Sequence, residues 1–283
     1  MKQELYTLKG YENYPMAIDV TLPEGNAPRG IALWAHGING FKDWGGMPII
    51  AEQFAQANLV FVKFNFSHNG TTPDFPDEIV DKESYGNDNY RIRQHDLQCV
   101  IEWCAKKAPE WGVPEKRVHL IGHSRGGTDA ILFASANGTT LRSLTTWAAV
   151  AEATTPWRGF SEKEMESWRE KGVFYRKHGR TGQDLPIYYQ LYEEYQQHKQ
   201  RLNVEQAARE VKVPWLIVHG EDDPAVFVKN AYDLKAYQPE AEVKIIPQAD
   251  HVFNRSHPWR EKTLPEATEK LVEANIDFIQ RQH

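Results

Sequence analysis

The chain has 283 residues, of which 41% are hydrophobic and 25% charged, and a net charge of −6. This length can bury one large core with an insertion, and an acidic balance without a basic run argues against nucleic acid or an anionic membrane surface as partner. No apolar run approaches the roughly 20 residues of a membrane span, and the start at Met1 lacks the apolar core of a secretion signal. We therefore expect a soluble, cytoplasmic protein in which Cys99 and Cys104 stay reduced.

Apolar runs that alternate with amphipathic segments predict the fold. The predicted strands are 4–8, 14–22, 30–35, 59–64, 117–121, 143–150, 214–219 and 243–246, and the predicted helices are 48–57, 90–108, the segment after Ser124, and 264–279. Residues 65–89 are polar and predict a long loop. From residue 30 onward this order predicts an α/β fold, a doubly wound and mostly parallel sheet of about eight strands with an antiparallel edge.

Residues 152–210 interrupt the alternation with nine aromatic side chains among many charges. A capping box at Ser161 to Glu164 predicts a helix through Lys171, followed by a hairpin and a helix over 187–201. We interpret this segment as a lid inserted between two core parts, 1–151 and 211–283; a surface decoration or a dimer arm is the alternative. Its aromatic content suggests an apolar or aromatic moiety in the substrate, although the rings can equally pack against one another.

Ser124 lies in Gly122-His123-Ser124-Arg125-Gly126, directly after a predicted buried strand and before a predicted helix. This G-x-S-x-G pattern is typical of a strained strand-to-helix turn that exposes a nucleophilic serine, and its glycines let strand and helix approach closely. The alternative is an ordinary glycine-rich turn. The context predicts that Ser124 is a nucleophile at the carboxyl edge of the sheet.

A serine nucleophile needs a base within hydrogen-bond reach and a third group that orients the base. Two later strands lead into loops that offer them, Glu221-Asp222-Asp223-Pro224 after strand 214–219 and Asp250-His251 after strand 243–246. The order serine, acid, histidine is that of α/β-hydrolases. Both loops are expected at the edge that carries Ser124.

On these motifs the chain resembles the α/β-hydrolase superfamily, in the branch of dienelactone hydrolases, esterases and acyl-peptidases, over residues 14 to 281. The family's acid commonly lies three residues after the glycine that closes its strand and just before a proline, which selects Asp223 and leaves Asp222 as the second choice. The resemblance makes His251 the base. It also implies an oxyanion hole formed by the backbone N–H groups of Ile38, in the loop His36 to Gly40, and of Arg125.

These assignments predict a serine hydrolase that cleaves a carboxylic ester or a related acyl bond of a small molecule, without cofactor and without metal. An aminopeptidase-like acyl-peptide hydrolase, a thioesterase and a non-catalytic binding module on the same fold are the alternatives. For the Arg125 side chain we favour pairing with a lid carboxylate such as Glu152 over attraction of an acidic acyl group. The oligomeric state stays open, with a homodimer as one option.

Overall fold

The computed structural model describes residues 1–114 and 117–282; Glu115, Lys116 and His283, which the domain prediction assigns to the core, lie outside the described residues. The main sheet has eight strands in the order β1-β2-β4-β3-β5-β6-β9-β10. Their bounds are β1 Lys2–Lys9, β2 Pro15–Leu22, β3 Ile31–Ala35, β4 Val60–Phe64, β5 Val118–His123, β6 Ser143–Trp147, β9 Trp215–Gly220 and β10 Glu242–Ile246. β2 runs antiparallel to β1 and to β4, and the other neighbours pair in parallel. The predicted α/β fold class is confirmed.

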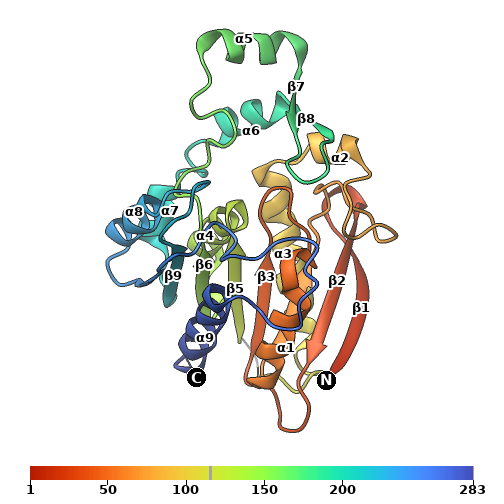
Figure 1. Cartoon of the computed structure of the whole chain (residues 1–283), viewed down its shortest axis with the longest axis vertical. Coiled ribbons are helices and arrows are strands. Elements are labelled where there is room, and N and C mark those ends of the chain that lie inside the picture. Colours follow the sequence, from red (N-terminus) through yellow and green to blue (C-terminus); the bar gives the residue numbers. More distant parts are fainter. Residues whose placement is uncertain (115–116, 283) are drawn as a thin grey trace.

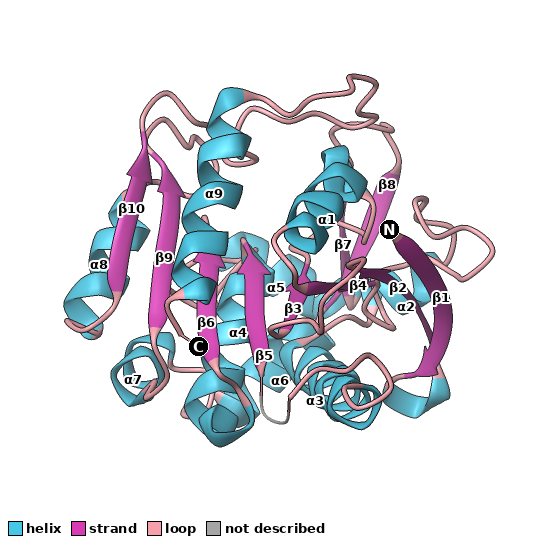
Figure 2. Cartoon of the chain, turned by 90° about the horizontal axis from the view of Figure 1, so that it is seen from below, coloured by secondary structure: helices cyan, strands magenta, loops and turns pink. Residues whose placement is uncertain are grey.

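Helices cover both faces of this sheet (Figure 2). One face carries α1 (Met47–Gln56) and α9 (Glu266–Gln280); the other carries α3 (Tyr90–Lys107), α4 (Arg125–Asn137), α7 (Val204–Glu210) and α8 (Lys229–Tyr237). Each face has its own buried core, with Phe54 and Leu271 in one and Leu97 and Ile131 in the other. Burial of a whole aliphatic side chain stabilises a fold by roughly 1.5–3 kcal/mol. The two cores therefore hold the strands in place, and with them the strand ends at which the site lies.

The inserted segment stands above the sheet as α5 (Glu162–Lys171), the hairpin β7 (Val173–Lys177) and β8 (Asp184–Tyr188), and α6 (Gln190–His198) (Figure 1). The predicted capping box is present at Ser161 and Glu164. The segment has a small core of its own, built from Trp157, Trp168 and Ile187 together with partly buried aromatic side chains. The two chain termini lie at the opposite end of the molecule (Figure 1).

The structure differs from the sequence expectations in three short helices. α2 (Lys82–Gly86) lies inside the predicted loop 65–89 and packs against β8, with Leu185 buried beside Tyr85. α8 follows the loop that carries Asp223 and was not predicted. α7 was not predicted either; it places Ala207 and Ala208 in the main core, so the part of the chain that stands above the sheet ends before residue 210. Helices of five to nine residues carry too few turns for a clear 3.6-residue period. Within the described ranges, no helix combines the length and the apolarity needed to cross a bilayer.

Candidate active site

Ser124 lies between β5 and α4 with a strained backbone, φ 56° and ψ −124°. A side chain on either flanking glycine would collide with backbone: a Cβ at Gly122 would lie 2.3 Å from the Gly126 carbonyl oxygen, and one at Gly126 would lie 2.4 Å from that of Ala35. Positive φ is costly for a non-glycine residue and persists only where the surroundings enforce it. The strand-turn-helix predicted from the motif is therefore present, with Ser124 at the carboxyl end of β5.

The loop after β3 lies against this turn. A Cβ at Gly37 would come within 2.9 Å of the Ser124 Cβ, so the loop passes directly beside the serine. Ile38 and Arg125 both line the cavity that Ser124 lines. In the described part of the chain, neither the Ile38 N–H nor the Arg125 N–H donates to a protein acceptor. Two backbone N–H groups without a protein acceptor thus belong to residues that line the cavity of Ser124.

His251 and Asp223 are joined by a hydrogen bond of 2.7 Å between the histidine Nδ1 and a carboxylate oxygen. The other oxygen of Asp223 accepts from the backbone N–H groups of Ala225 and Val226, at 2.9 and 2.8 Å. Burial alone would raise the pKa of this carboxyl, but the hydrogen bonds from His219 and His251 outweigh it, so that the pKa of Asp223 lies well below its usual range. The alternative acid, Asp222, is exposed to solvent. His251 lines the same cavity as Ser124.

Two further histidines, His219 and His123, surround this pair. The buried His219, at the end of β9, has its Nε2 2.7 Å from the Val226 carbonyl and 3.3 Å from the Asp223 carboxylate. The His123 ring lies 4.9 Å from that of His251, and its Nε2 is 2.9 Å from the His251 carbonyl oxygen. Burial, followed by the charge on His251, holds the pKa of His123 well below its usual range. A neutral His123 then donates from Nε2 and fixes the His251 backbone.

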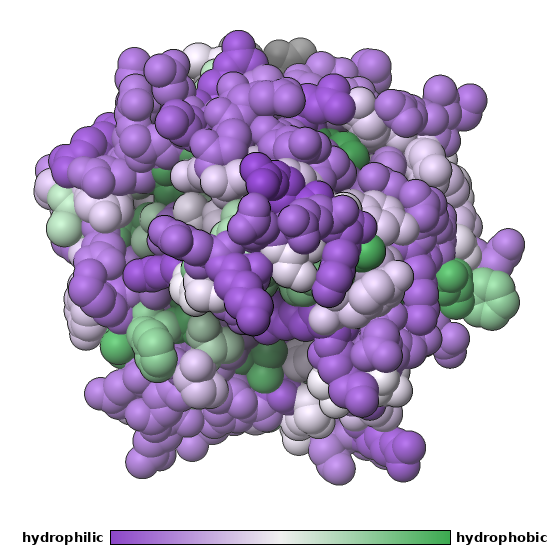
Figure 3. Space-filling view, turned by 90° about the horizontal axis from the view of Figure 1, so that it is seen from above, coloured by the Kyte–Doolittle hydropathy of each residue, from purple (hydrophilic) through white to green (hydrophobic). Residues whose placement is uncertain are grey.

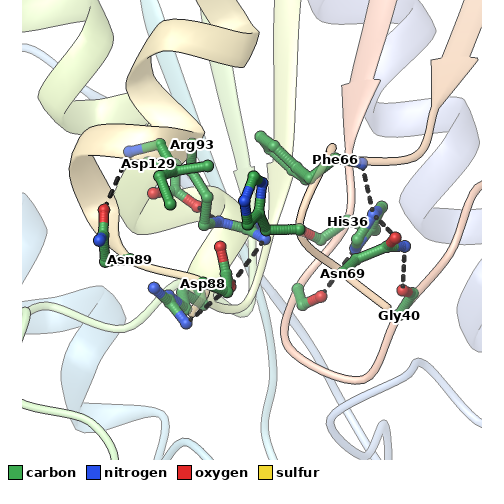
Figure 4. A network of polar contacts seen from close by, with 12 residues as sticks. His36, Gly40, Phe66, Asn69, Asp88, Asn89, Arg93 and Asp129 are labelled. Carbon is green, nitrogen blue, oxygen red and sulfur yellow. Dashed lines mark hydrogen bonds and ion pairs between the residues drawn. The ribbon is translucent and has the colours of Figure 1, made fainter. Parts of the chain in front are cut away.

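A polar network anchors the loop that follows β3 (Figure 4). The Arg93 guanidinium donates to the His36 carbonyl at 2.8 Å and to the Asp129 carboxylate at 2.5 Å. His36 is fully buried, and burial lowers its pKa to about 3, so its ring is neutral. Its Nε2 accepts from the Phe66 N–H at 3.3 Å, which leaves Nδ1 to donate to the Gly37 carbonyl at 2.8 Å. Residues far apart in the sequence therefore fix the position of the loop.

The pairing expected for the Arg125 side chain is wrong. Arg125 donates to Asp88 at 3.1 Å and its guanidinium lies 4.7 Å from the centre of the Tyr90 ring, whereas Glu152 pairs with Arg158. Asp88 belongs to the segment between β4 and α3, which the sequence analysis treated as a loop without a role. Pairing with a carboxylate, the option that we favoured over attraction of an acidic acyl group, is present, although the partner is a different residue.

The cavity that contains Ser124, His251, Ile38 and Arg125 has a volume of about 990 Å³. None of the nine aromatic residues of the inserted segment is among the described residues that line it; seven of them pack against one another in the small core of that segment, whereas Tyr175 is exposed and Tyr188 bonds to Glu83. Aromatic lining comes instead from Trp34, Trp44 and Phe227. The lid composition therefore does not support an aromatic substrate moiety. Among residues 1–114 and 117–282, no group of three or more His, Cys, Asp or Glu side chains is arranged to hold a metal ion.

Several solved structures are similar to this chain over nearly its whole length. Est1E from Butyrivibrio proteoclasticus, solved with ferulic acid, aligns with a TM-score of 0.73 at 16% identity, covering 97% of this chain and 98% of its own. The esterase domain of a Rhodothermus marinus protein gives 0.66 at 19%, and dienelactone hydrolase from Anabaena variabilis gives 0.62 at 15%, each covering 99% of both chains. At these identities the likeness shows the fold. No curated protein sequence gives a significant match.

A family model described as the alpha/beta hydrolase family matches residues 32–261. The match begins in β3 and ends beyond His251, so it spans the serine turn and both loops that follow β9 and β10. This is the family that the motifs resembled. The chain belongs to the alpha/beta hydrolase family.

Proposed function

We propose that the protein is a serine hydrolase that cleaves a carboxylic ester or a related acyl bond through a Ser124-His251-Asp223 triad. The observation that carries the proposal is the 2.7 Å contact between His251 Nδ1 and Asp223, on a cavity that Ser124 lines from a strained turn. A serine held at positive φ beside two unpaired backbone donors has no evident structural purpose.

In the proposed mechanism the Ser124 hydroxyl attacks the acyl carbon while the His251 Nε2 accepts its proton. The backbone N–H groups of Ile38 and Arg125 stabilise the oxyanion, each by roughly 3–4 kcal/mol. His251 then protonates the leaving group and activates water for deacylation. Asp223, kept ionised by its hydrogen bonds, holds the imidazole in the tautomer that exposes Nε2 and stabilises the imidazolium. The proposal requires no cofactor.

Labelling with a fluorophosphonate tests the proposal without knowledge of the substrate. We expect one covalent adduct in the intact mass of the wild type and none in Ser124→Ala, because the probe reacts with an activated serine. A folded wild-type protein that gains no adduct would favour a non-catalytic binding module on this fold. A panel of oxygen-ester, thioester and amide substrates then separates an esterase from a thioesterase or an acyl-peptide hydrolase.

The cellular setting that we propose is the cytoplasm, with a small-molecule acyl compound as substrate. Cys104 is buried, and both Cys99 and Cys104 are free thiols. Free thiols persist in a reducing compartment. Fractionation of cells that express the protein at its native level tests this placement.

A further inference from the structure

A single short segment, α2 with the two residues after it, is hydrogen-bonded to both parts of the chain that supply the proposed oxyanion hole. Ile38 is followed by Asn39, whose Oδ1 accepts from the Tyr85 hydroxyl at 2.5 Å. The Arg125 guanidinium donates to the Asp88 carboxylate at 3.1 Å. Tyr85 and Asp88 stand close together in the sequence, so one segment is bonded to Arg125 and to the direct neighbour of Ile38.

The Ile38 N–H and Asn39 belong to one tight turn. The Gly40 N–H closes this turn on the Gly37 carbonyl at 3.2 Å. Asn39 is the third residue of the turn and has a φ of 58°, a conformation that glycine and asparagine adopt most readily and that costs free energy in any residue with a side chain. The bond from Tyr85 holds Asn39 in this conformation, and with it the orientation of the Ile38 N–H.

Tyr85 is a suitable donor because it is buried and stays protonated. The residue is 8% exposed, although the face of the molecule above the site is mostly hydrophilic (Figure 3). Burial, followed by the charge of Asp88, raises the pKa of the Tyr85 hydroxyl to about 12. The ring forms a buried cluster with Ile79 and with Leu185 of β8. The hydroxyl is therefore a fixed donor at neutral pH.

Asp88 holds the side chain of Arg125. Arg125 is buried, and among the described residues Asp88 is the one carboxylate within ion-pair distance of it. Burial would lower the pKa of Arg125, but the charge of Asp88 outweighs it and raises that pKa. The same carboxylate oxygen lies 3.7 Å from the Arg93 guanidinium, which donates to the His36 carbonyl (Figure 4). Without the charge of Asp88 the Arg125 guanidinium would be a buried cation that lacks its counter-ion, so its side chain and backbone would shift.

We propose that Tyr85 and Asp88 are positioning residues of the oxyanion hole, Tyr85 for the Ile38 N–H and Asp88 for the Arg125 N–H. This inference rests on the proposed hydrolase function and adds to it. Neither Tyr85 nor Asp88 is among the described residues that line the cavity, so both act through their neighbours and not on the substrate. Oxyanion stabilisation needs donors that are fixed before the reaction, and a displacement of about 1 Å can cost about 100-fold in rate.

The first test measures hydrolysis of para-nitrophenyl butyrate by Tyr85→Phe, which lacks only the hydroxyl. We expect kcat and kcat/KM to fall together by about 10-fold, because an interaction made only in the transition state changes kcat and leaves KM as it is. Asp88→Asn should lower both by at least about 10-fold. Tyr85→Phe keeps the ring in its buried cluster, so this variant should fold even where Asp88→Asn does not.

Fluorophosphonate labelling taken to completion counts the active sites in each preparation. A merely structural role would lower the number of labelled sites and leave kcat per site at the wild-type value. A positioning role lowers kcat per site instead.

Tyr188→Phe is the matched control. The Tyr188 hydroxyl donates to Glu83 at 2.6 Å, which is a bond of the same kind to the same helix but not to the loop after β3. The ring, which packs closely on Gly86, stays in place. We expect the control to retain the wild-type kcat per site. A loss as large as that of Tyr85→Phe would mean that the stability of α2 matters and not the bond to Asn39, and would overturn the proposal.

Inhibition by trifluoromethyl butyl ketone tests the oxyanion hole directly. The Ser124 oxygen adds to the ketone carbon, its proton passes to His251, and the carbonyl oxygen becomes the oxyanion. The inhibition constant should therefore rise in Tyr85→Phe and in Asp88→Asn by the same factor as kcat/KM falls. Methyl butyl ketone, which lacks the activating fluorines, should bind equally to all variants.

The outcomes separate this proposal from the hydrolase function on which it rests. An active wild type whose kcat/KM and inhibition constant stay the same in Tyr85→Phe and in Asp88→Asn would overturn the positioning role and leave the hydrolase standing. If the wild type is labelled but does not hydrolyse this ester, the rate of labelling replaces kcat/KM in the comparison, because the phosphoryl oxygen needs the same donors. A wild type that gains no adduct and hydrolyses no ester would contradict the hydrolase and the positioning role with it.

Discussion

Glu194 on α6 provides a test of how the inserted segment is held on the sheet. Its carboxyl is buried, with 7% of the residue exposed, and among the described residues its Oε2 has no hydrogen-bond partner. Burial raises the pKa of Glu194 to about 7, although the charges of Arg125 and Arg91 act to lower it. The inserted segment thus carries a carboxyl that is uncharged below neutral pH.

The sign of the effect on stability follows from proton counting. In the unfolded chain a glutamate titrates near 4.5, so between that pH and about 7 the folded protein binds the extra proton. The free energy of unfolding therefore decreases as the pH rises through this window. A shift of this size corresponds to about 3 kcal/mol, which is lost in full above the folded pKa.

Glu194→Gln replaces the carboxyl by a neutral amide of the same shape and should remove this pH dependence. We expect the variant to become the more stable protein as the pH rises above neutral, by up to about 3 kcal/mol. Urea denaturation at a series of pH values from about 4.5 to about 8.5 measures the difference, with the urea dependence of the free energy as a check on two-state unfolding. Glu193→Gln is the control, because Glu193 is exposed on the same helix. Wild-type and Glu194→Gln stabilities that run parallel across this range would refute the reasoning.

Three other substitutions test the serine turn, the Arg93 network and the proposed triad. Gly126→Ala should destabilise the protein by about 1–3 kcal/mol in urea denaturation, because its Cβ would lie 2.4 Å from the Ala35 carbonyl oxygen; Gly138→Ala, whose Cβ would meet Val213 at 3.9 Å, should be tolerated. Arg93→Met should cost about 3–5 kcal/mol in the same assay, since Asp129 stays buried without its cation, and adding Asp129→Asn should recover part of that loss. Asp223→Asn should lower kcat by about 10⁴ while the melting temperature shows a folded protein, because an amide favours the wrong His251 tautomer; a mild loss would contradict the assigned role.

The serine turn could be predicted because the residues that form it are neighbours in the sequence. β5, the Gly122 and Gly126 spacing and α4 follow one another within a few residues, and the steric reason for each glycine is visible in the structure. The loops with Asp223 and His251 could be predicted almost as well. Parallel strands bring their carboxyl ends to one edge, so a residue just past a strand end is placed by the sheet itself.

Interactions between distant segments could not be predicted in this way. The partner of Arg125 is Asp88, 37 residues away in a segment without strong periodicity, and nothing in either sequence context selects this pair over Glu152. The same holds for Arg180 and Arg255, which share a cavity only because the hairpin folds over the site. The aromatic residues of the inserted segment show the converse case: composition indicated a hydrophobic cluster but left open whether it faces the site or packs on itself.

Because the inserted segment has a small aromatic core of its own, the residues that line the cavity depend on two different parts of the structure for their positions. Ser124, Asp223 and His251 depend on the sheet for their positions, whereas Arg176 and Arg180 depend on a hairpin that packs on Trp168 and its neighbours. Changes in the hairpin can therefore alter which molecules enter the site without disturbing the strand ends. A segment built in this way can diverge or be exchanged between related proteins as one unit. Directed evolution for new substrates would therefore start with the residues between β7 and β8.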